Sequence, residues 1–460
     1  MLFATCVAAQ QPPQPIEPLP TPQQVAWHEM ETYAFIHFGP NTFLDREWGY
    51  GDVSPESFRP TRLDCEQWVR VCKAAGMKGI ILTAKHHDGF CLWPSKYTDY
   101  SVLASPYKDG KGDVVGELAA ACRKYGLGMG LYLSPWDRHQ ASYGTPLYVE
   151  FFHAQLEELL TQYGELFEVW FDGANGEGPN GKKQTYNWPL FNSTVAQLQP
   201  NAVIFSDVGP GCRWVGNENG QAGFTCWSTL NIDGFTPGNA PALDTLNQGN
   251  MHGSYWIPAE TDVSIRPGWF WHQNEHPKSL DELLTIYYNS VGRNSLLLLN
   301  VPPDRRGLIP YEDSLRLMEL RAAIDSIFAI NLAKQAKITA SNTRGKSNSK
   351  KYNVSHLVDD NYHSYWATDD SVLCPTLSLD FQTPITFSRI MLQEYIPLGQ
   401  RIAAFHVEYL DNNGNWNTLT TATTIGYKRI LLTPTVTTSH LRIVIDHSLA
   451  PPILNHIFLS

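Results

Sequence analysis

Short apolar runs alternate with amphipathic segments between residues 32 and 328. The strand-like runs end in polar or turn residues and cover residues 32–40, 78–90, 127–137, 166–176, 202–211 and 295–304. The segments between them have helical spacing and cover residues 64–76, 113–126, 147–164, 187–200, 279–292 and 311–328. Strands that alternate with helices predict a parallel sheet. This many units in one segment favour a closed (β/α)8-like barrel over an open sheet.

The alternation of strands and helices is interrupted between residues 212 and 278. It is rich in Gly, Trp and Asn, and helical spacing is lost. We predict the next barrel strand at residues 254–265 and expect a barrel with one or two weak helices.

The texture of the chain changes again after about residue 332. Short alternating runs such as "PTLSLDF", "SRIMLQEY" and "AFHVEYL" are separated by Thr, Ser, Asn and Gly. Such runs are typical of an antiparallel β-sandwich. The predicted fold is therefore an α/β barrel over residues 25–331, followed by a β-sandwich over residues 332–460.

The first 24 residues are predicted to be a signal-peptide remnant and a Pro/Gln-rich linker. Leu2 to Ala9 form a short apolar run, and Val7-Ala8-Ala9 resembles an export cleavage site. No Lys or Arg precedes the run, so either the signal is incomplete or the start of the chain is misplaced. Export to the periplasm or the medium is expected, with a lipid anchor on Cys6 as the alternative. The sequence contains no run of 18 apolar residues, so no transmembrane segment is predicted.

The predicted barrel strands carry polar or aromatic side chains at their C-terminal ends. These side chains are His37, His86, His87, Tyr132, Asp172, Arg213, Trp214 and Glu218. The C-terminal ends of barrel strands meet at one mouth, where the active sites of such barrels lie. We therefore expect a polar pocket with aromatic walls.

One of these positions stands out. Asp172 follows the apolar run Val169-Trp170-Phe171 and precedes a Gly- and Asn-rich turn. A charge at the end of a buried strand lies at the rim of the barrel. Asp172 is therefore either a rim salt-bridge residue or a catalytic group.

Composition narrows the class of partner. The formal net charge is -11, which argues against nucleic acid as a ligand. Charged residues make up only 17% of the chain, while aromatic residues reach 12%. Aromatic faces suit sugar rings, although a large aromatic core gives the same composition.

No cofactor is predicted, because the sequence lacks a phosphate-cradling glycine loop and the histidines and cysteines lack metal-ligand spacing. The cysteines show no CxxC pair or dense framework. Free core cysteines are the favoured interpretation, and one or two disulfides are the alternative if the chain is exported.

The two carboxylates Asp172 and Glu218, with aromatic walls, suggest glycoside hydrolysis. One carboxylate attacks or stabilises the anomeric carbon, and the other protonates the leaving oxygen. Asp172 lies on a strand, as a rigidly held nucleophile should. Glu218 lies in a loop, where its neighbours can raise its pKa for acid work.

Six motifs carry a resemblance to a known family. They are "FIHFG" at 35–39, "REWG" at 46–49, "TAKHHDGF" at 83–90, "GLYLS" at 130–134, "VWFDG" at 169–173 and "RWVGNE" at 213–218. Together they resemble the α-L-fucosidases of glycoside hydrolase family 29. The resemblance implies a metal-independent, retaining, exo-acting enzyme with Asp172 as the nucleophile.

The same resemblance implies which residues grip fucose: His37, Glu47, Trp48, His86, His87, Tyr132 and Arg213. The "GNE" stretch resembles the branch that cleaves α-1,3 and α-1,4 fucose from Lewis-type glycans, with Glu218 as the acid/base. Trp269 and Trp271 are candidate walls for the fucose methyl group, with core packing as the alternative. Trp214 or Trp227 is expected to contact the branch galactose of such a substrate.

Three alternatives remain at this point. The chain could be a broad-specificity α-L-fucosidase, or a related retaining exo-glycosidase acting on another sugar such as galactose. An aromatic methyl pocket would disfavour a sugar with a C6 hydroxyl. The third alternative is a non-catalytic sugar-binding protein, against which the presence of both carboxylates argues.

The C-terminal segment "SHLVDDNYHSYWATDD" at 355–370 resembles the start of discoidin-like domains, or family 32 carbohydrate-binding modules. The resemblance implies a structural calcium held by an Asp-Gly-Asp-x-x-Thr loop and a C-terminal glutamate. Here Asn361 and Asn455 replace two carboxylates, and Ser364 replaces the threonine. Fewer charged ligands lower calcium affinity, so we expect weak or no calcium binding, with Asp359 capping its turn.

Overall fold

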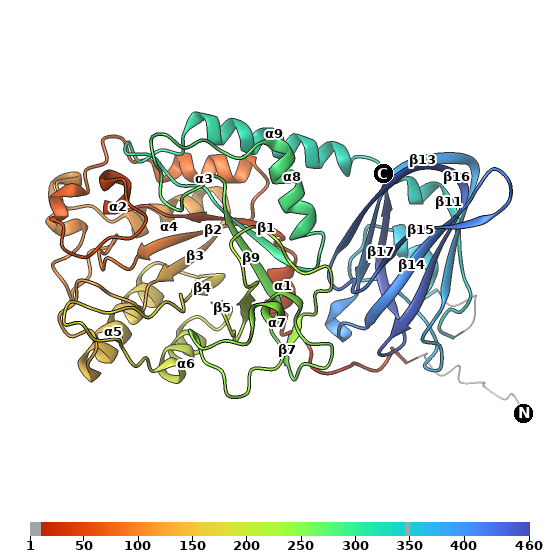
Figure 1. Ribbon diagram of the computed structural model, residues 1–460, viewed down its shortest axis with the longest axis horizontal. Coiled ribbons are helices and arrows are strands. Elements are labelled where there is room, and N and C mark those ends of the chain that lie inside the picture. The colour runs from red at the N-terminus through yellow and green to blue at the C-terminus, as the bar shows by residue number, and fades with distance from the viewer. Residues whose placement is uncertain (1–10, 346–349) are drawn as a thin grey trace, which may run out of the picture. The chain divides into compact units, whose positions relative to one another are not determined.

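The computed structural model describes residues 11–345 and 350–460 (Figure 1). The predicted export run Leu2 to Ala9, with Cys6, lies outside the described residues. The chain divides into two compact units, of which one comprises residues 21–291 and 295–327. The other comprises residues 328–460 together with 292–294 and the N-terminal segment up to residue 20.

The first unit is a closed barrel of eight parallel strands, counted within the described residues. The strands, in the order in which they neighbour one another, are β1 (Thr32–Ile36), β10 (Leu296–Asn300), β9 (Ala259–Ser264), β6 (Cys212–Trp214), β5 (Val203–Ser206), β4 (Glu168–Trp170), β3 (Gly128–Leu133) and β2 (Gly79–Lys85). Every neighbouring pair is parallel. The predicted (β/α)8-like barrel is thus confirmed.

Two strands correct the sequence-based assignment. Residues 212–214, expected to be a loop, form barrel strand β6. The predicted strand at 254–265 splits into β8 (Tyr255–Trp256), which pairs with β7 (Thr229–Leu230) in a separate ribbon, and β9. β4 is equally short but is followed by an apolar residue in the run Val169-Trp170-Phe171, whereas Arg213 interrupts β6, which explains why β6 was missed.

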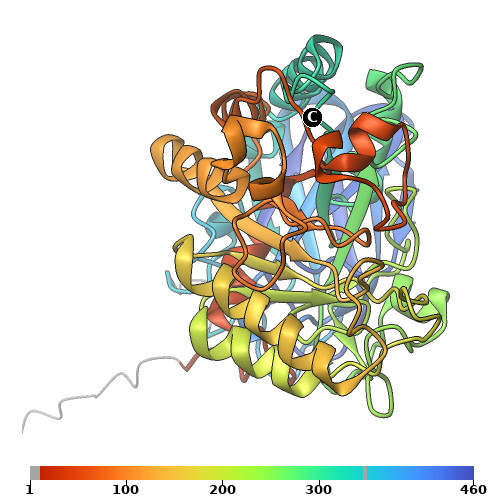
Figure 2. The same cartoon turned by 90° about the vertical axis from the view of Figure 1, so that its left-hand side faces the viewer.

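Helices cover the outside of the barrel (Figures 1 and 2). The long ones are α3 (Cys65–Ala74), α4 (Val114–Tyr125), α5 (Pro146–Gln162), α6 (Trp188–Leu198), α8 (Leu280–Asn289) and α9 (Tyr311–Ile327). Shorter helices are α1 (Pro22–His28), α2 (Pro40–Leu44), α7 (Leu243–Gln248), η1 (Pro55–Ser57), η2 (Val102–Ala104) and η3 (Tyr107–Gly110). Asp64 and Asp113 cap α3 and α4 by accepting backbone N–H bonds from Gln67 and Gly116.

The inside of the barrel is filled by large side chains from alternate strand positions. Tyr33, Phe35, Tyr132, Trp170 and Phe205 belong to this core. Aromatic rings that fill the interior leave no channel, so the chemistry is confined to the ends of the strands.

The second unit is an antiparallel β-sandwich, as predicted. Its strands are β11 (Ala336–Ala340), β12 (Trp366–Ala367), β13 (Thr376–Glu394), β14 (Ile402–Leu410), β15 (Trp416–Ala422), β16 (Arg429–Ser448) and β17 (Ile453–Leu459), with short helices η4 (Leu332–Gln335), η5 (Val354–Val358) and η6 (Ile396–Leu398). The order is β12-β17-β13-β16-β14-β15, and β11 also pairs with β13. Alternate residues such as Leu377, Leu379 and Phe381 are buried in its core.

The described part of the predicted N-terminal linker is bound to this second unit. Arg344 Nε donates to the carbonyl oxygen of Gln11 at 2.9 Å, and Arg401 Nη2 donates to that of Gln14 at 2.6 Å. The backbone N–H of Ile16 donates to Leu398 O at 3.1 Å. The described part of the segment is therefore held at several points along its backbone.

The calcium-loop region of the sandwich is closed by its own side chains. Asp359 accepts hydrogen bonds from the Asn361 backbone N–H at 2.9 Å and from the Ser364 hydroxyl at 2.7 Å. His356 Nδ1 lies 2.9 Å from the same carboxylate. These contacts are those of a turn cap, as expected for Asp359.

Cys65, Cys72, Cys91, Cys122, Cys212, Cys226 and Cys374 are all free, which agrees with the favoured interpretation of the cysteines. Within the described ranges, no helix is both long enough and apolar enough to cross a membrane.

Candidate active site

The polar strand ends of the barrel converge on two adjoining cavities. We call the first the histidine cavity; its volume is about 230 Å³, and His37, His86 and His87 line it together with Trp48, Tyr132 and Trp269. We call the second the aspartate cavity; its volume is about 190 Å³, and Asp207, Trp214, Phe205 and Gly173 line it. Trp170, Asp172, Ala174, Glu218 and Asp262 line both. The two predicted catalytic carboxylates therefore lie where the cavities meet.

Asp172 is held at this junction by neutral donors. Its Oδ2 accepts a hydrogen bond from the Tyr132 hydroxyl at 3.1 Å, and its Oδ1 accepts one from the Ala174 backbone N–H at 2.7 Å. His87 Nε2 lies 3.7 Å from the same Oδ2. Burial lowers the pKa of His87, so that imidazole is mostly neutral near pH 7. A carboxylate fixed in direction and facing a cavity fits a reacting group better than a rim salt bridge.

The hydrogen bonds around two of the histidines define their tautomers. Both N–H donors of the Asn300 amide are used, by Ser264 Oγ and Trp269 O, so Asn300 Oδ1 accepts from His37 Nδ1 at 2.9 Å. The Ser134 hydroxyl donates to Trp136 O, so its oxygen accepts from His87 Nδ1 at 2.7 Å. In both rings Nε2 is then left as an acceptor for a sugar hydroxyl.

All three imidazoles are kept uncharged by burial. Burial lowers the pKa of His37 to about 3 and lowers that of His86 well below its ordinary value, with the neighbouring histidines adding to the effect. His86 Nδ1 is buried without a hydrogen-bond partner. Neutral rings can both donate to and accept from hydroxyl groups, which suits an uncharged polyol such as a sugar.

Glu218 occupies the rim on the other side of Asp172. The residue as a whole is exposed, but its carboxyl group turns toward the cavities and accepts from Trp269 Nε1 at 3.3 Å. Partial burial of the carboxyl raises its pKa, and the negative charges of Asp172 and Glu47 raise it further. These are the conditions that keep a carboxylic acid protonated for proton donation.

Glu47 supports the cavity without lining it. Its carboxylate accepts backbone N–H bonds from Trp269 at 2.9 Å and Phe270 at 3.2 Å. His272 Nε2 lies 2.6 Å from the same group. Glu47 therefore fixes the loop that presents the Trp269 ring and acts on the pocket through that ring.

Besides Glu47, two predicted sugar contacts line neither cavity. The Arg213 side chain is completely buried, and its guanidinium donates to the carbonyl oxygens of Leu246, Ile257 and Trp227. It points outward from β6, because Cys212 and Trp214 on either side of it point inward. Trp271 lines neither cavity and instead lies under the Arg305 guanidinium, 5.9 Å from the ring centre. Trp269, the other candidate wall, lines the histidine cavity.

Three polar residues of the site were missed from sequence. Asp207 follows β5 as Asp172 follows β4, so the strand-end rule could have found it. Asn300 ends β10 by the same rule. Asp262 lies within β9 and is 3% exposed, so only its polarity inside a buried strand could have drawn notice. Burial raises the pKa of Asp207 to about 6, with the charge of Asp172 adding to the shift.

One possible metal cluster exists among the described residues, and it lies inside the barrel. Glu168, Cys212 and Glu260 place one ligand atom each within 4.8 Å of one another. Their oxygens are already engaged: Trp27 Nε1 donates to Glu168 at 2.9 Å, and Trp170 Nε1 donates to Glu260 at 2.7 Å. Burial raises the pKa of both carboxyl groups, which favours their protonated forms. This donor set fits a protonated carboxyl pair better than a cation site.

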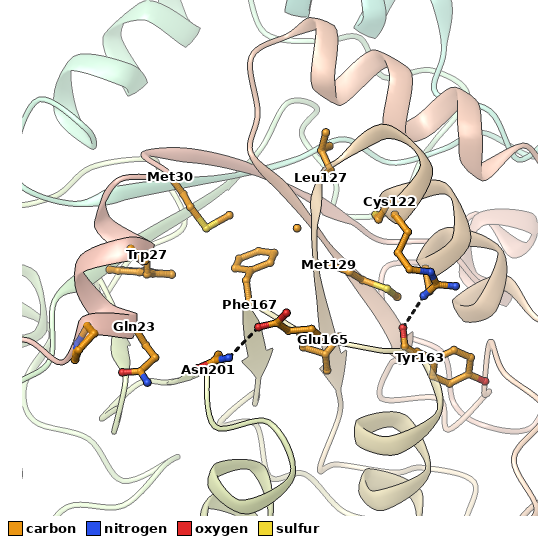
Figure 3. Close-up of a pocket in the computed structure, with 16 residues that line it drawn as sticks. Gln23, Trp27, Met30, Cys122, Leu127, Met129, Tyr163, Glu165, Phe167 and Asn201 are labelled. Atoms are coloured by element: carbon orange, nitrogen blue, oxygen red, sulfur yellow. Dashed lines mark hydrogen bonds between the residues drawn. The ribbon is translucent and has the colours of Figure 1, made fainter.

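A larger cavity, of about 640 Å³, lies at the opposite end of the barrel (Figure 3). Met30, Leu127, Met129 and Phe167 line it, and Phe167 projects toward its centre. Phe167 immediately precedes β4, whereas Asp172 follows its end. The cavity therefore belongs to the N-terminal face, which in such barrels serves stability rather than catalysis.

Comparison with known proteins identifies the family. The α-L-fucosidase family profile matches residues 20–323. α-L-fucosidase 1 of Arabidopsis thaliana is 47% identical over 454 residues, which cover 97% of this chain and 88% of the plant protein. The chain belongs to the α-L-fucosidase family. The prediction that the chain is an enzyme, an α-L-fucosidase among the glycoside hydrolases, is thus confirmed.

Solved structures of the family extend this likeness to the whole chain. A Ruminococcus gnavus family 29 fucosidase in complex with fucose has a TM-score of 0.90 at 35% identity, over 98% of this chain and 96% of that one. A family 29 member from a rumen bacterium has a TM-score of 0.85 at 44% identity, over 98% and 78% of the two chains. Residues 337–453 match the F5/8 type C domain, so the discoidin-like identity of the sandwich is also confirmed.

Proposed function

We propose that this family member is a retaining exo-α-L-fucosidase that releases terminal α-1,3- and α-1,4-linked fucose from Lewis-type glycans. The observation that carries the proposal is the position of Asp172 and Glu218 at the junction of two small cavities. Two small cavities that meet at these carboxylates suit a cleaved bond with one sugar on each side. Fucose would occupy the histidine cavity and the leaving sugar the aspartate cavity.

In the first step, Asp172 attacks the anomeric carbon and Glu218 protonates the leaving oxygen. The bond between fucose and the leaving sugar breaks, and a fucosyl ester forms on Asp172. Tyr132 and the Ala174 N–H hold the two carboxylate oxygens and so orient the attack. The raised pKa of Glu218 favours the protonated form that this step requires.

In the second step, Glu218 removes a proton from water, which attacks the ester. The charge of Asp172 is one of the causes that raise the pKa of Glu218. Formation of the ester removes that charge, so the pKa of Glu218 falls when the residue must become a base. The same geometry therefore supports both roles.

The histidine cavity suits fucose. Its neutral imidazoles face the ring hydroxyls, while Trp269, Trp48 and Phe35 offer carbon surface to the methyl group. A C6 hydroxyl, as in galactose, would lose hydrogen bonds against that surface, which disfavours the alternative of another exo-glycosidase. The fucose complex of the similar Ruminococcus gnavus enzyme supports the same sugar.

The aspartate cavity supports the Lewis-type substrate. Trp214 and Phe205 provide aromatic faces, and Asp207 provides an acceptor, in the space next to the leaving oxygen. A branched leaving group has a second sugar close to the cleaved bond and could fill this space. Trp227 is buried, at 3% exposure, so Trp214 is the better partner for that sugar.

Two measurements test the proposal. The first is the rate of fucose release from 2-, 3-, 4- and 6-linked oligosaccharides; faster cleavage of a Lewis trisaccharide than of 2′-fucosyllactose is expected. The reverse order would place the enzyme among broad-specificity fucosidases. The second is proton NMR during hydrolysis, where the α-anomer of fucose should form first. Initial formation of the β-anomer would exclude the retaining mechanism.

Two further expectations stay as proposals. The apolar N-terminal run supports export to the periplasm or the medium, with a lipid anchor on Cys6 as the alternative. Weak or absent calcium binding by the sandwich is supported by the amides at Asn361 and Asn455. Thermal unfolding with and without a chelator tests the second, and a drop of several degrees on chelation would contradict it.

A further inference from the structure

Asp262 is a carboxylate of the active site to which neither the motifs nor the mechanism assigns a task. It belongs to β9, whose inward side chains are Glu260, Asp262 and Ser264. Glu260 contacts Trp170 and Ser264 contacts Asn300, so both neighbours on that face hold residues of the pocket. Asp262 lies between them and lines both cavities.

The contact that Asp262 makes is with a tryptophan. Trp214 Nε1 donates to Asp262 Oδ1 at 2.9 Å, while Asp262 as a whole is 3% exposed. A buried carboxyl group is costly unless it is hydrogen-bonded. The indole N–H is equally in need of an acceptor, because Trp214 is half-buried at the end of β6.

Trp214 itself has two connections to catalysis. Its ring lines the aspartate cavity, where the leaving sugar is expected. It also begins the loop that delivers Glu218 four residues later, and Glu218 is held at its far end by Trp269. Movement of the Trp214 ring would therefore disturb both the wall of the aspartate cavity and the position of Glu218.

We propose that Asp262 is a positioning residue for the leaving-group side of the site: its hydrogen bond fixes the Trp214 ring as the surface on which the leaving sugar stacks. The inference rests on the function proposed above. Burial raises the pKa of Asp262 well above its ordinary value, with the charges of Glu218 and Glu260 adding to the shift, which favours its protonated form over a nucleophilic carboxylate.

The test compares Asp262→Ala, Asp262→Asn, Trp214→Phe and the double variant D262A/W214F. For each, kcat/KM is measured on a Lewis trisaccharide and on an aryl fucoside. Asp262→Ala should lower kcat/KM about tenfold on the trisaccharide, mainly through KM, and much less on the aryl fucoside. Asp262→Asn keeps an oxygen acceptor for the indole and should restore the ratio between the two substrates.

The double variant separates positioning from direct contact. If Asp262 acts through Trp214, the double variant should lose no more than Trp214→Phe alone. Multiplied losses would mean that Asp262 touches the substrate itself and would overturn the inference. Equal damage by Asp262→Asn and Asp262→Ala would overturn it as well.

A spectroscopic readout keeps the test independent of the proposed function. With ¹⁵N-labelled tryptophan, the Trp214 indole N–H signal is assigned by its loss in Trp214→Phe. Asp262→Ala should shift or broaden that signal, and Asp262→Asn should leave it near its parental position. If the parent releases no fucose from any substrate, the proposed function fails while this readout still decides the contact.

Glu158→Ala is the matched control for loss of a buried carboxyl group that accepts from an indole. Glu158 accepts an indole N–H from Trp93 at 3.0 Å, but neither residue lines the two cavities. This variant should lower the melting temperature and leave the ratio between the two substrates unchanged. A changed ratio would show that any buried carboxyl–indole pair has this effect, and the assignment to Asp262 would fall.

Discussion

The barrel contains two carboxyl pairs that share a strand and differ in almost everything else. Glu168 begins β4 and pairs with Glu260 inside the barrel, whereas Asp172 follows the end of β4 and faces the cavities with Glu218. Glu168 and Glu260 are completely buried, and protein N–H and O–H groups occupy their oxygens. The side chain of Asp172 is 27% exposed and opens onto unfilled space.

The difference shows what distinguishes a reacting carboxylate from a structural one. Both environments shift pKa values, so a shifted pKa alone does not identify the site. The inner pair has its hydrogen-bonding capacity used within the protein. The outer pair directs hydrogen-bonding capacity at a cavity. The Nε2 atoms of His37 and His87, which can accept hydrogen bonds, line the same space.

The variant Asp172→Ala is the strongest test of whether the outer pair is the reacting one. Turnover should fall by at least about 10³-fold, because the covalent route is lost. The melting temperature should change little, since Asp172 contacts only a few neutral groups at the rim. Added azide should partly restore cleavage and give a β-fucosyl azide. Near-parental activity would show that the outer pair is not the reacting pair.

Glu218→Ala should cause the next largest loss of activity, and the loss should be greatest for substrates with poor leaving groups. Loss of a general acid is expected to cost about 10²–10⁴-fold on natural oligosaccharides with poor leaving groups. Activated aryl fucosides need less protonation and should suffer less. The basic limb of the pH profile should also disappear, because it reports ionisation of the acid. Equal losses with an intact limb would point to another acid.

For the inner pair, Glu168→Gln should change stability in a pH-dependent way. Burial raises the pKa of Glu168 to about 7, so the folded protein holds a proton that the unfolded chain loses near pH 4.3. The free energy of unfolding therefore falls as pH rises between these values, by roughly 4 kcal/mol. The glutamine amide mimics the protonated acid and cannot ionise, so this part of the fall should vanish in the variant.

Chemical unfolding of the barrel at pH 5 and pH 8 measures this change. The gain of Glu168→Gln over the parent should be larger at pH 8 than at pH 5. Glu150→Gln, on the exposed side of α5, is the control and should show no such difference. A gain that is equal at both pH values would mean that Glu168 does not titrate in this range.

Sequence patterns were sufficient where a strand or helix repeats long enough to show its period. The β-sandwich and the barrel strands β1 to β5 were visible for that reason, and the strand-end rule then brought His37, His86, Tyr132 and Asp172 to one mouth. Strand β6, which Arg213 interrupts at its centre, was not visible, so nothing in the pattern opposed the sugar contact that the family resemblance implied for Arg213.

Contacts between loops distant in sequence were beyond the sequence patterns. Trp269 and Trp271 have the same residue type two positions apart, and nothing local decides which one faces the cavity. The decision comes from Glu47, more than 200 residues earlier, which binds the Trp269 and Phe270 N–H groups. Asp262 was missed for a similar reason, because its partner Trp214 lies on another strand.

The smallest expected effect distinguishes these two tryptophans. Trp269 Nε1 donates to Glu218, and this hydrogen bond favours the ionised form and lowers the pKa of that carboxyl group. Trp269→Phe removes the donor, so the pKa of Glu218 should rise and the basic limb of the kcat/KM profile should move to higher pH, by less than about one unit. Trp271→Phe should leave the limb in place, because Trp271 lies against Arg305 outside both cavities. If the basic limb moved in Trp271→Phe and stayed in place in Trp269→Phe, then Trp271 and not Trp269 would be the tryptophan that faces the histidine cavity.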